Sequence, residues 1–382
     1  MIKQIKLENF KCFNKETTFE LSKVNLFVGY NGRGKSTVIQ ALLLLSQSVC
    51  HYGDLKTLEV NGDYVHLGLF EDLINVDNDV KSTIKFSFLT DQKEGSKIFL
   101  GYNEKKDSER LGQICNLEAD GYDYMVKSVA SLDLKEKETI EVSVMVDRYP
   151  NGVNAVFQNC NYISAERQGP TLFEEKRDIS INNPVGKRGE NVLNYIAKNK
   201  DLKEEINWWV DYIMNGGDLS LKGNSKDSSV LSLNFSIPEN SIKKSFKAIN
   251  CGFGYSYVLS IVVNALMMKK GTLIVENPEA HLHPLAQFRL TELLAKISSK
   301  DIQVFIETHS EHIINGFRII ALRQNLELSN KDLSIYFFDK DFSIARLKVE
   351  SNGRIKNWPK GFFDQYEWEM TEIIKLGSLV KC

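Results

Sequence analysis

The hydrophobic pattern at the start of the chain predicts a hairpin, a third strand and then a helix. Residues 2–7 and 17–21 alternate between apolar and polar positions, which predicts two antiparallel strands. Residues 24–28 are almost continuously apolar and lead directly into a glycine-rich loop. Residues 37–45 are apolar on nearly every side, which is typical of a buried helix rather than a surface helix.

The pattern changes in the middle of the chain. From about residue 60 to 165, short alternating stretches such as 83–88 and 140–146 are separated by charged turns, which predicts an antiparallel sheet lobe. From about 186 to 250 the sequence is polar and mixed, and it predicts one helix at 202–214.

Residues 251–320 alternate in the order helix, strand, helix, strand, helix. The two strands, 272–275 and 303–306, are continuous apolar runs, which is typical of parallel strands covered on both faces. Beyond them, residues 333–338 and 343–349 predict a hairpin, and a short helix follows it. The pattern as a whole indicates an α/β protein.

Composition excludes several classes of protein. The chain has 382 residues, 42% of them hydrophobic and 26% charged, which is ordinary for a globular protein. Its formal net charge of -2 argues against a strongly basic, DNA-coating protein, although it does not exclude a local basic groove. The chain has no run of about 18 to 20 apolar residues that would span a membrane, and no signal peptide at its start. We therefore do not expect this protein to be membrane-bound, secreted or fibrous.

The cysteines indicate a reducing compartment. The six of them are scattered and show no CxxC spacing, so a disulfide scaffold or a zinc ribbon is not expected. A cytoplasmic location is the default for such a chain. The cysteines are Cys12, Cys50, Cys115, Cys160, Cys251 and Cys382.

The glycine-rich loop has the chemistry of a phosphate site. Residues 29–36 fit the pattern G-x-x-x-x-G-K-[ST] without a mismatch, between a predicted strand and a predicted helix. The glycines let successive N–H groups point inward, Lys35 supplies a charge to the phosphates, and the Ser36 hydroxyl can bind Mg²⁺. We expect ATP and Mg²⁺ to be bound through Gly29, Asn31, Gly32, Arg33, Gly34, Lys35, Ser36 and Thr37.

Acidic residues follow the strand predicted at 272–275. Glu276 lies at its end, where a carboxylate can position Mg²⁺, so the expected metal ligands are Ser36 and Glu276. His309 follows the next strand, where it would contact the γ-phosphate. Residues 251–256 begin a helix with glycine and serine, and Gly254 and Ser256 are suited to a phosphate there.

Together these motifs resemble an ABC-type ATPase head of the SMC/Rad50 kind. The resemblance rests on a Walker A motif at 29–36, a degenerate signature at 252–256, a Walker B motif at 272–279 and the switch histidine His309. The string Pro-Glu-Ala-His-Leu-His-Pro at 278–284 is similar to the OLD-like AAA ATPases of bacteria.

Two further strings resemble one subgroup of that family, which carries a small "WPxGFFDQ" C-terminal domain. They lie at 162–170 and 358–365. The resemblance implies a head-to-tail homodimer, or a higher oligomer, with ATP between the P-loop of one subunit and Gly254 and Ser256 of the other. It also implies a partner effector encoded alongside, a nuclease or a toxin, as in anti-phage systems of the Septu and retron types.

One departure from the family pattern concerns hydrolysis. The family ends its acidic strand with Asp-Glu, whereas this chain has Glu276 and Asn277. An amide cannot act as a general base, and loss of such a group typically costs about 10²–10⁴ in rate. Glu279 would replace it if its loop turns inward. We expect a slow ATPase with Glu276, Asn277, Glu279 and His309 in the catalytic region, and the alternative is a nucleotide-gated clamp without turnover.

A zinc site and a metal-dependent nuclease are two alternatives to this interpretation. His281, His283, His309 and His312 lie among acidic residues, which is compatible with zinc, but packing of His281 and His283 at a dimer seam is favoured. The Asp-Lys-Asp string at 339–341 would suit a metal-dependent nuclease but fits a hairpin turn better.

Small basic clusters leave DNA or RNA open as a partner, although such clusters are usually solvated surface. They are Lys187-Arg188, Lys243-Lys244 with Lys247, and Lys269-Lys270.

Several single residues carry two interpretations. Arg33 is expected to face solvent rather than a dimer partner, and Arg167 to make a structural contact rather than a nucleotide contact. Gln47 lies 11 positions after Ser36, roughly 16 Å along a helix, and should not reach the metal. One of Trp208 and Trp209 should pack in the core, and the aromatic residues of 358–363 cover either the core edge or a docking patch.

The predicted organisation is therefore an ABC-type P-loop ATPase head at 1–320 and a small hairpin-plus-helix domain at 321–382. Within the head, the β lobe at about 60–165 is an insertion, and a helical and mixed segment spans about 186–250. The segment from the signature to the switch histidine spans 252–309.

Overall fold

The computed structural model of the chain describes most of the sequence. The described residues are 1–91, 97–106, 108–119, 122–124, 126–127, 145–146, 154, 156–179, 182–223, 229–239, 242–323, 328–359 and 361–377. Of the strand predicted at 140–146, residues 140–144 therefore lie outside the described part. The remaining two residues form the short strand β10 (Met145–Val146).

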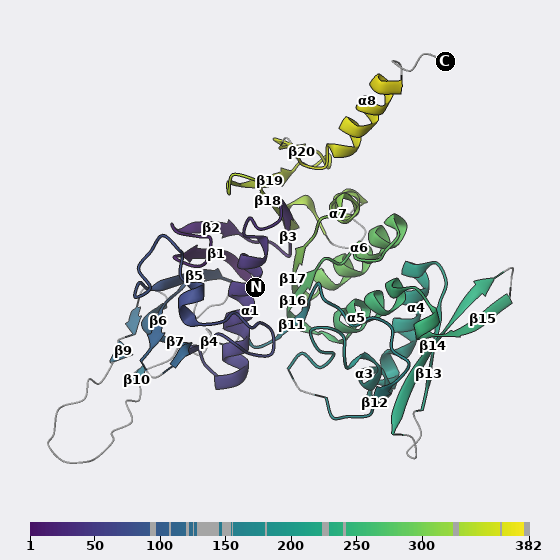
Figure 1. Ribbon diagram of the computed structural model, residues 1–382, viewed down its shortest axis with the longest axis horizontal. Coiled ribbons are helices and arrows are strands. Elements are labelled where there is room, and N and C mark those ends of the chain that lie inside the picture. The colour runs from purple at the N-terminus through teal and green to yellow at the C-terminus, as the bar shows by residue number, and fades with distance from the viewer. Residues whose placement is uncertain are drawn as a thin grey trace.

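A mixed sheet forms the centre of the molecule (Figure 1). Its strands are β3 (Val24–Gly29), β11 (Cys160–Ile163), β16 (Lys270–Glu276), β17 (Asp301–Glu307), β18 (Leu333–Phe338), β19 (Ile344–Val349) and β20 (Ile355–Lys356). They lie in the order β11-β16-β17-β3-β18-β19-β20. The pairings from β11 to β18 are parallel, as predicted for β16 and β17, and β18-β19 and β19-β20 are antiparallel.

A second, antiparallel sheet forms a lobe beside the first. Its order is β2-β1-β5-β6-β7-β4, and β8 also pairs with β7, so both the predicted N-terminal hairpin and the antiparallel character of the lobe are confirmed. A separate two-stranded ladder joins β9 to β10. The strands are β1 (Ile2–Glu8), β2 (Thr17–Glu20), β4 (Thr57–Glu59), β5 (Ile84–Thr90), β6 (Lys97–Lys105), β7 (Ser108–Ala119), β8 (Tyr122–Tyr124) and β9 (Val126–Lys127).

Helices and a small sheet complete the fold. Helix α1 (Lys35–Tyr52) follows the P-loop and packs against β3, β11 and β17. The other helices formed by the described residues are α3 (Val192–Lys198), α4 (Lys203–Met214), α5 (Phe253–Met267), α6 (Pro284–Ser298), α7 (Glu311–Arg323) and α8 (Gln365–Gly377). The small sheet contains β12 (Glu174–Glu175), β13 (Asp218–Lys222), β14 (Val230–Glu239) and β15 (Ile242–Lys247). Short 3-10 helices are η1 (Phe70–Leu73), η2 (Lys200–Leu202), η3 (Ala248–Asn250) and η4 (Asn330–Asp332).

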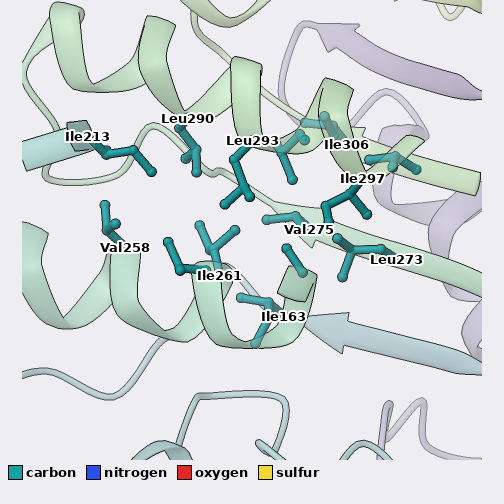
Figure 2. Packing of buried hydrophobic residues seen from close by; sticks show 14 of the residues in the cluster. Ile163, Ile213, Val258, Ile261, Leu273, Val275, Leu290, Leu293, Ile297 and Ile306 are labelled. Atoms are coloured by element: carbon teal, nitrogen blue, oxygen red, sulfur yellow. The ribbon is translucent and has the colours of Figure 1, made fainter. Parts of the chain in front are cut away.

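Two hydrophobic clusters pack on opposite faces of the central sheet. Side chains alternate along β3, so Leu26 joins the cluster with α4 to α7, and Phe27 joins the cluster with α1 and the lobe. Figure 2 shows Val275 of β16 meeting Ile261 of α5 and Leu293 of α6. Both faces are thus covered by apolar residues, which explains the continuous apolar runs of these strands. The helix predicted as buried is buried on nearly every side.

Two strands lie in the central sheet although the sequence pattern placed them elsewhere. The lobe was expected to extend to about residue 165, but β11 pairs in parallel with β16. The boundary expected at 320/321 separates β18 from β3, with which it pairs in parallel. The reason is physical: the partner of a parallel strand lies far away in the chain, so local alternation does not reveal it.

Two further expectations can be checked in the fold. Trp209 is 4% exposed and Trp208 is 57% exposed, so one of the two packs in the core as predicted. The segment 339–341 forms the turn between β18 and β19, where Asp341 accepts hydrogen bonds from the N–H and the hydroxyl of Ser343. None of the helices in the described residues combines the length and apolar character that a membrane span requires.

Candidate functional site

The P-loop connects the end of β3 to the start of α1, and its backbone requires glycine at two crowded positions. Gly29 has φ +119° and lies so close to β18 that a Cβ atom would overlap the carbonyl oxygen of Phe338. Gly34 has φ +103°, and a Cβ atom there would lie 2.8 Å from Cys12 Sγ. A larger residue at either site would meet both backbone strain and a neighbour. Strand β18 and the connection between β1 and β2 thus hold the loop on two sides.

Lys35 is the buried cation of this loop. Its side chain is 3% exposed, and its Nζ donates to the carbonyl oxygens of Gly29 at 3.0 Å and Tyr30 at 2.7 Å. Burial lowers the pKa of Lys35, and the nearby Glu307 carboxylate opposes that shift. The ammonium group therefore lies inside the loop at the N-terminus of α1, where an anion is favoured.

Glu307 is the carboxylate that meets the P-loop serine. The Ser36 hydroxyl donates to Glu307 Oε1 at 3.1 Å. Burial raises the pKa of Glu307 to about 7, and repulsion from Glu276 adds to this, while Ser36 and Lys35 oppose it. The other oxygen, Oε2, is buried and has no hydrogen-bond partner among the described residues. Sequence reasoning missed Glu307 as a site residue, although its place at the end of β17 beside the acidic strand was a usable signal.

The oxygens gathered here fit Mg²⁺. Glu276 and Glu307 are register partners on β16 and β17, so their side chains leave the sheet on the same face. Glu276 Oε2 accepts from the Ala165 N–H at 3.2 Å and the side chain bonds the Tyr162 hydroxyl, while burial raises its pKa. A hydroxyl with two carboxylates is a hard oxygen set, which Mg²⁺ prefers. Of the two expected ligands, Ser36 thus contacts Glu307, and Glu276 lies on the next strand.

Asn277 begins a tight turn after β16. Its φ is +43°, a left-handed conformation that asparagine tolerates better than most residues. Its N–H donates to the Glu307 carbonyl at 2.7 Å, and its own carbonyl accepts from Arg167. These backbone contacts therefore fix the Asn277 amide side chain directly after the end of β16.

Arg167 makes backbone contacts, in line with the structural interpretation. Its guanidinium donates to the carbonyls of Glu276, at 3.1 Å, and Asn277, and it lies 5.0 Å from the ring centroid of Tyr257. Burial lowers its pKa to about 10.

The loop that carries Glu279 turns inward. Glu279 Oε1 accepts from the His309 N–H at 2.7 Å, and Oε2 accepts from the Thr308 hydroxyl at 2.7 Å. Both carboxylate oxygens are thus bound to the loop after β17. Partial burial, together with the Lys35 ammonium, lowers the pKa of the His309 imidazole.

The other P-loop residues have mixed surroundings. Asn31 and Gly32 are exposed, and Thr37 is buried with its hydroxyl 3.7 Å from Cys12 Sγ. Arg33, which was expected to face solvent, is partly exposed, and its guanidinium lies 4.5 Å from the ring centroid of Phe342 in the turn after β18.

The predicted signature residues, Gly254 and Ser256, lie beside segments outside the P-loop. Gly254 is buried at the start of α5, where a Cβ atom would lie 2.7 Å from the His281 carbonyl oxygen. Ser256 lines a small cavity of about 30 Å³ with Thr171. The structure thus brings together the P-loop, the acidic strand ends and His309, and it places Gly254 and Ser256 beside other loops.

His281, His283 and Gln47 each make contacts that stabilise the fold. His281 packs against the rings of Phe253 and Tyr257 at 5.4 and 4.9 Å, and His283 caps α6 by accepting from the Leu285 N–H. No cluster of three or more potential metal-binding side chains of His, Cys, Asp or Glu occurs within the described ranges. Gln47 donates to the Glu59 carbonyl at 2.6 Å, in the direction of β4.

Two family models match the chain. Residues 24–315 match a family described as "AAA domain, putative AbiEii toxin, Type IV TA system". Residues 328–373 match a second family, described as a protein of unknown function (DUF3696). The first match includes the P-loop, both acidic strand ends and His309.

Curated relatives are distant. The chain is 26% identical over 187 residues to the "Structural maintenance of chromosomes protein 3 homolog" of Plasmodium falciparum, which covers 47% of this chain and 14% of that protein. It is 22% identical over 343 residues to the "OLD nuclease" of Thermus scotoductus, which covers 85% of this chain and 61% of that protein. The chain thus spans less than two thirds of either relative.

Solved structures agree on the fold. A SmcHead bound to the C-winged helix domain of ScpA has a TM-score of 0.51 at 12% identity, covering 91% of this chain and 98% of that one. An Smc head domain with an extended coiled coil from Pyrococcus furiosus, bound to the C-terminal domain of ScpA, has the same score and identity and covers 98% and 99%. With the family match over 24–315, these findings confirm the expected fold class, a P-loop ATPase head of the SMC type: the chain belongs to the family described as "AAA domain, putative AbiEii toxin, Type IV TA system".

Proposed function

We propose that the protein is a slow, ATP-driven switch that closes as a dimer around ATP and Mg²⁺ and controls a partner effector in anti-phage defence. The observation that carries the proposal is the contact of Ser36 with Glu307 beside the buried Lys35. It joins a phosphate-binding loop to an acidic pair of strand ends in one chain, which is the arrangement that nucleotide hydrolysis requires.

Each of these groups has a part in binding. The P-loop N–H groups and Lys35 would hold the phosphates, and Ser36, Glu276 and Glu307 would hold Mg²⁺. The metal, when bound, neutralises the charge that develops on the transferred phosphoryl group. His309 would contact the γ-phosphate, because it lines the same cavity as Gly29 and Tyr30 of the P-loop.

Dimerisation would bring the signature to this site. Gly254 and Ser256 lie at the start of α5, beside Phe253, which is 52% exposed. In a head-to-tail pair, each α5 N-terminus would face the phosphates bound by the other copy, where its dipole favours an anion.

The polar surroundings of the acidic turn support slow hydrolysis. Asn277 cannot take a proton from water, and both oxygens of Glu279 already accept hydrogen bonds. The same observation favours a second candidate, a nucleotide-gated clamp or scaffold in which ATP is held without turnover and the partner, DNA or a toxin, is released when the dimer opens.

Support for an effector comes from the relatives. The description of the matched family includes a putative toxin, and one relative is named a nuclease. The two SMC heads were solved with bound ScpA domains. We therefore propose that cleavage or toxicity belongs to a partner. Nucleic acid remains the alternative partner, although Lys187 and Arg188 already bind the Tyr64 carbonyl and Glu166.

The test is phosphate release by the purified chain with ATP and Mg²⁺, beside binding of a fluorescent ATP analogue. Lys35→Ala is the control and should abolish both. Release above this control, at a slow rate, supports the switch. Binding without release supports the clamp, and absence of binding contradicts both.

A second variant separates the two candidates. Asn277→Glu supplies the missing base and should raise the rate of phosphate release at least about tenfold if the protein is a switch. An unchanged rate, with ATP binding intact, would favour the clamp.

A further inference from the structure

The P-loop touches the C-terminal turn at 361–365. Gly361 approaches Tyr30 so closely that a Cβ atom on it would lie 2.7 Å from the Tyr30 hydroxyl. Phe362 is 1% exposed and packs on Phe337, whose ring centroid lies 6.2 Å from that of Tyr30. A cavity of about 210 Å³ separates this turn from His309. The turn is therefore a wall of the nucleotide site.

Helix α8 grows directly out of this wall. Asp364 accepts from the Gly361 N–H at 2.8 Å, and α8 begins at the next residue. Figure 1 shows α8 projecting away from the body of the molecule, far from β15 of the same chain. Helix α8 thus starts at the mouth of the nucleotide site and extends outward.

The α8 surface combines exposed apolar residues with acidic ones. Its exposed large apolar side chains are Trp368, Met370, Ile373, Ile374 and Leu376, which are 60%, 38%, 61%, 69% and 54% exposed. Glu369, also exposed, lies one helical turn before Ile373. So many large apolar residues on a projecting helix are the mark of an interaction surface.

A surface of opposite charge borders the signature. We call it the β15–η3 surface; its apolar members are Phe246, Ile249 and Phe253, which are 36%, 44% and 52% exposed. Phe246 is the register partner of Phe235, which packs against Tyr255 of α5, so it lies on the α5 side of the small sheet.

The positive charge of this surface comes from Lys244. It lies two positions before Phe246 on β15 and therefore on the same face. The β15–η3 surface is thus apolar and basic, whereas the α8 surface is apolar and carries the exposed Glu369 beside the ion pair of Glu372 with Lys375.

We propose that α8 of one copy docks on the β15–η3 surface of a second copy of this chain. The two surfaces match in apolar character and are opposite in charge. Both also border the same interface, because α8 leaves from the P-loop wall and the β15–η3 segment leads directly into the signature at 252–256. At about 1.5 Å per residue, the 13 residues of α8 extend about 20 Å, enough to reach past the nucleotide onto a facing copy.

Docking of α8 would make the dimer sensitive to the nucleotide. Tyr30 belongs to the loop that holds the phosphates and contacts the turn that orients α8. This inference rests on the proposed ATP-closed dimer, and it assigns α8 as the clamp that holds the dimer shut.

The experiment measures the dimer dissociation constant of the full chain by analytical ultracentrifugation with ATP and Mg²⁺. The variant Ile373→Ser/Ile374→Ser removes two exposed side chains of α8, so folding is preserved and ATP binding by the monomer should be unchanged. The dissociation constant should rise at least about tenfold. The matched control is Val76→Ser/Val80→Ser, which removes two exposed valines of the lobe and should leave dimerisation unchanged.

Charge reversal supplies a second arm. Glu369→Lys and Lys244→Glu should each weaken the dimer several-fold, and the two combined should restore it. A wild-type dimer that needs ATP and is lost in Lys35→Ala, but is unaffected by the α8 variants, would overturn this inference and leave the proposed function standing. A wild-type chain that stays monomeric with bound ATP would overturn both.

Discussion

At the scale of single residues, Glu307 contacts the P-loop serine with one carboxylate oxygen and offers the other to a bound cation. One of its oxygens accepts from Ser36, and the other is buried without a partner in the described chain. Glu307→Gln keeps the shape but removes the charge. We expect the Mg²⁺ concentration for half-maximal ATP binding to rise about 10- to 100-fold, by analogy with the loss of metal-site contacts.

A titration of a fluorescent ATP analogue with Mg²⁺ checks this expectation. The exposed Glu71→Gln is the matched control, because it makes the same chemical change far from the site. Equal Mg²⁺ dependence in wild type and Glu307→Gln would remove Glu307 from the metal site.

Glu174 gives a prediction for pH. It accepts hydrogen bonds from Asn194 and from backbone N–H groups, and burial raises its pKa to about 7. The folded state therefore binds the proton more tightly than the unfolded state, and this group contributes stability that is lost as pH rises from about 4.5 to about 7. Above pH 7 the protein carries the cost of a buried charge.

Glu174→Gln should remove that cost. We expect the free energy of unfolding at pH 8 to rise by about 1 to 3 kcal/mol, and the gain to shrink toward pH 5. Urea unfolding at the two pH values measures it. Glu175→Gln, on the exposed neighbour in β12, should change little. A gain of equal size at both pH values would indicate a packing effect instead.

Candidate site residues can be predicted from the sequence where a local pattern defines them. The P-loop and Glu276 followed from spacing alone. Glu307 did not, because its importance comes from the register of β16 with β17, which places it beside Glu276. The contacts of Arg167 likewise depend on β11 lying beside β16, a pairing that local sequence does not contain.

At the scale of elements, the C-terminal turn is held by a close approach between glycine and the P-loop. Gly361 has φ +82° and faces the Tyr30 hydroxyl. Gly361→Ala adds left-handed strain and a steric overlap, and should lower the free energy of unfolding by about 1 to 2 kcal/mol and weaken ATP binding. Thermal unfolding and ATP titration measure the two effects.

The matched control is Gly53→Ala, at φ +78° with open space around it, which should lower stability through strain without affecting ATP binding. Adding Tyr30→Phe to Gly361→Ala removes the hydroxyl and should recover the steric part of the loss. If Gly361→Ala binds ATP as tightly as Gly53→Ala does, the turn is not a wall of the site.

Element types were well predicted, and their partners were not. Continuous apolar runs identified β16 and β17 as parallel strands because both faces of the sheet are covered. Alternation identified the hairpin of β1 and β2 because these two antiparallel strands follow one another in the chain. The same alternation could not show that β18 lies beside β3, since the choice among distant partners is made by the packing of both faces.

At the scale of the whole molecule, β18 makes the head and the C-terminal segment interdependent. It contributes Ile335 and Phe337 to one hydrophobic cluster and Tyr336 and Phe338 to the other. Burial of such side chains contributes about 1.5 to 3 kcal/mol each, so their loss removes more than about 6 kcal/mol. That is comparable with the total stability of a typical domain.

A chain ending at residue 328 should therefore aggregate or fail to unfold cooperatively. A chain ending at residue 364 keeps β18 and the turn and loses α8, whose apolar residues are exposed, so its unfolding temperature should stay close to that of the full chain. Soluble yield and calorimetry compare the two. Cooperative unfolding of the shorter chain at the full-length temperature would show that the head is independent of β18.

The pairing of Gly29 with Phe338 has a consequence for the order in which the protein becomes active during its synthesis. The ribosome makes β3 (Val24–Gly29) well before β18 (Leu333–Phe338), so the emerging chain at first carries a phosphate loop that lacks one of its supporting strands. We expect ribosome-stalled chains to capture ATP only once β18 has left the exit tunnel. A partly translated chain that lacks β18 would then bind no ATP, and nucleotide binding would begin only after β18 has been translated.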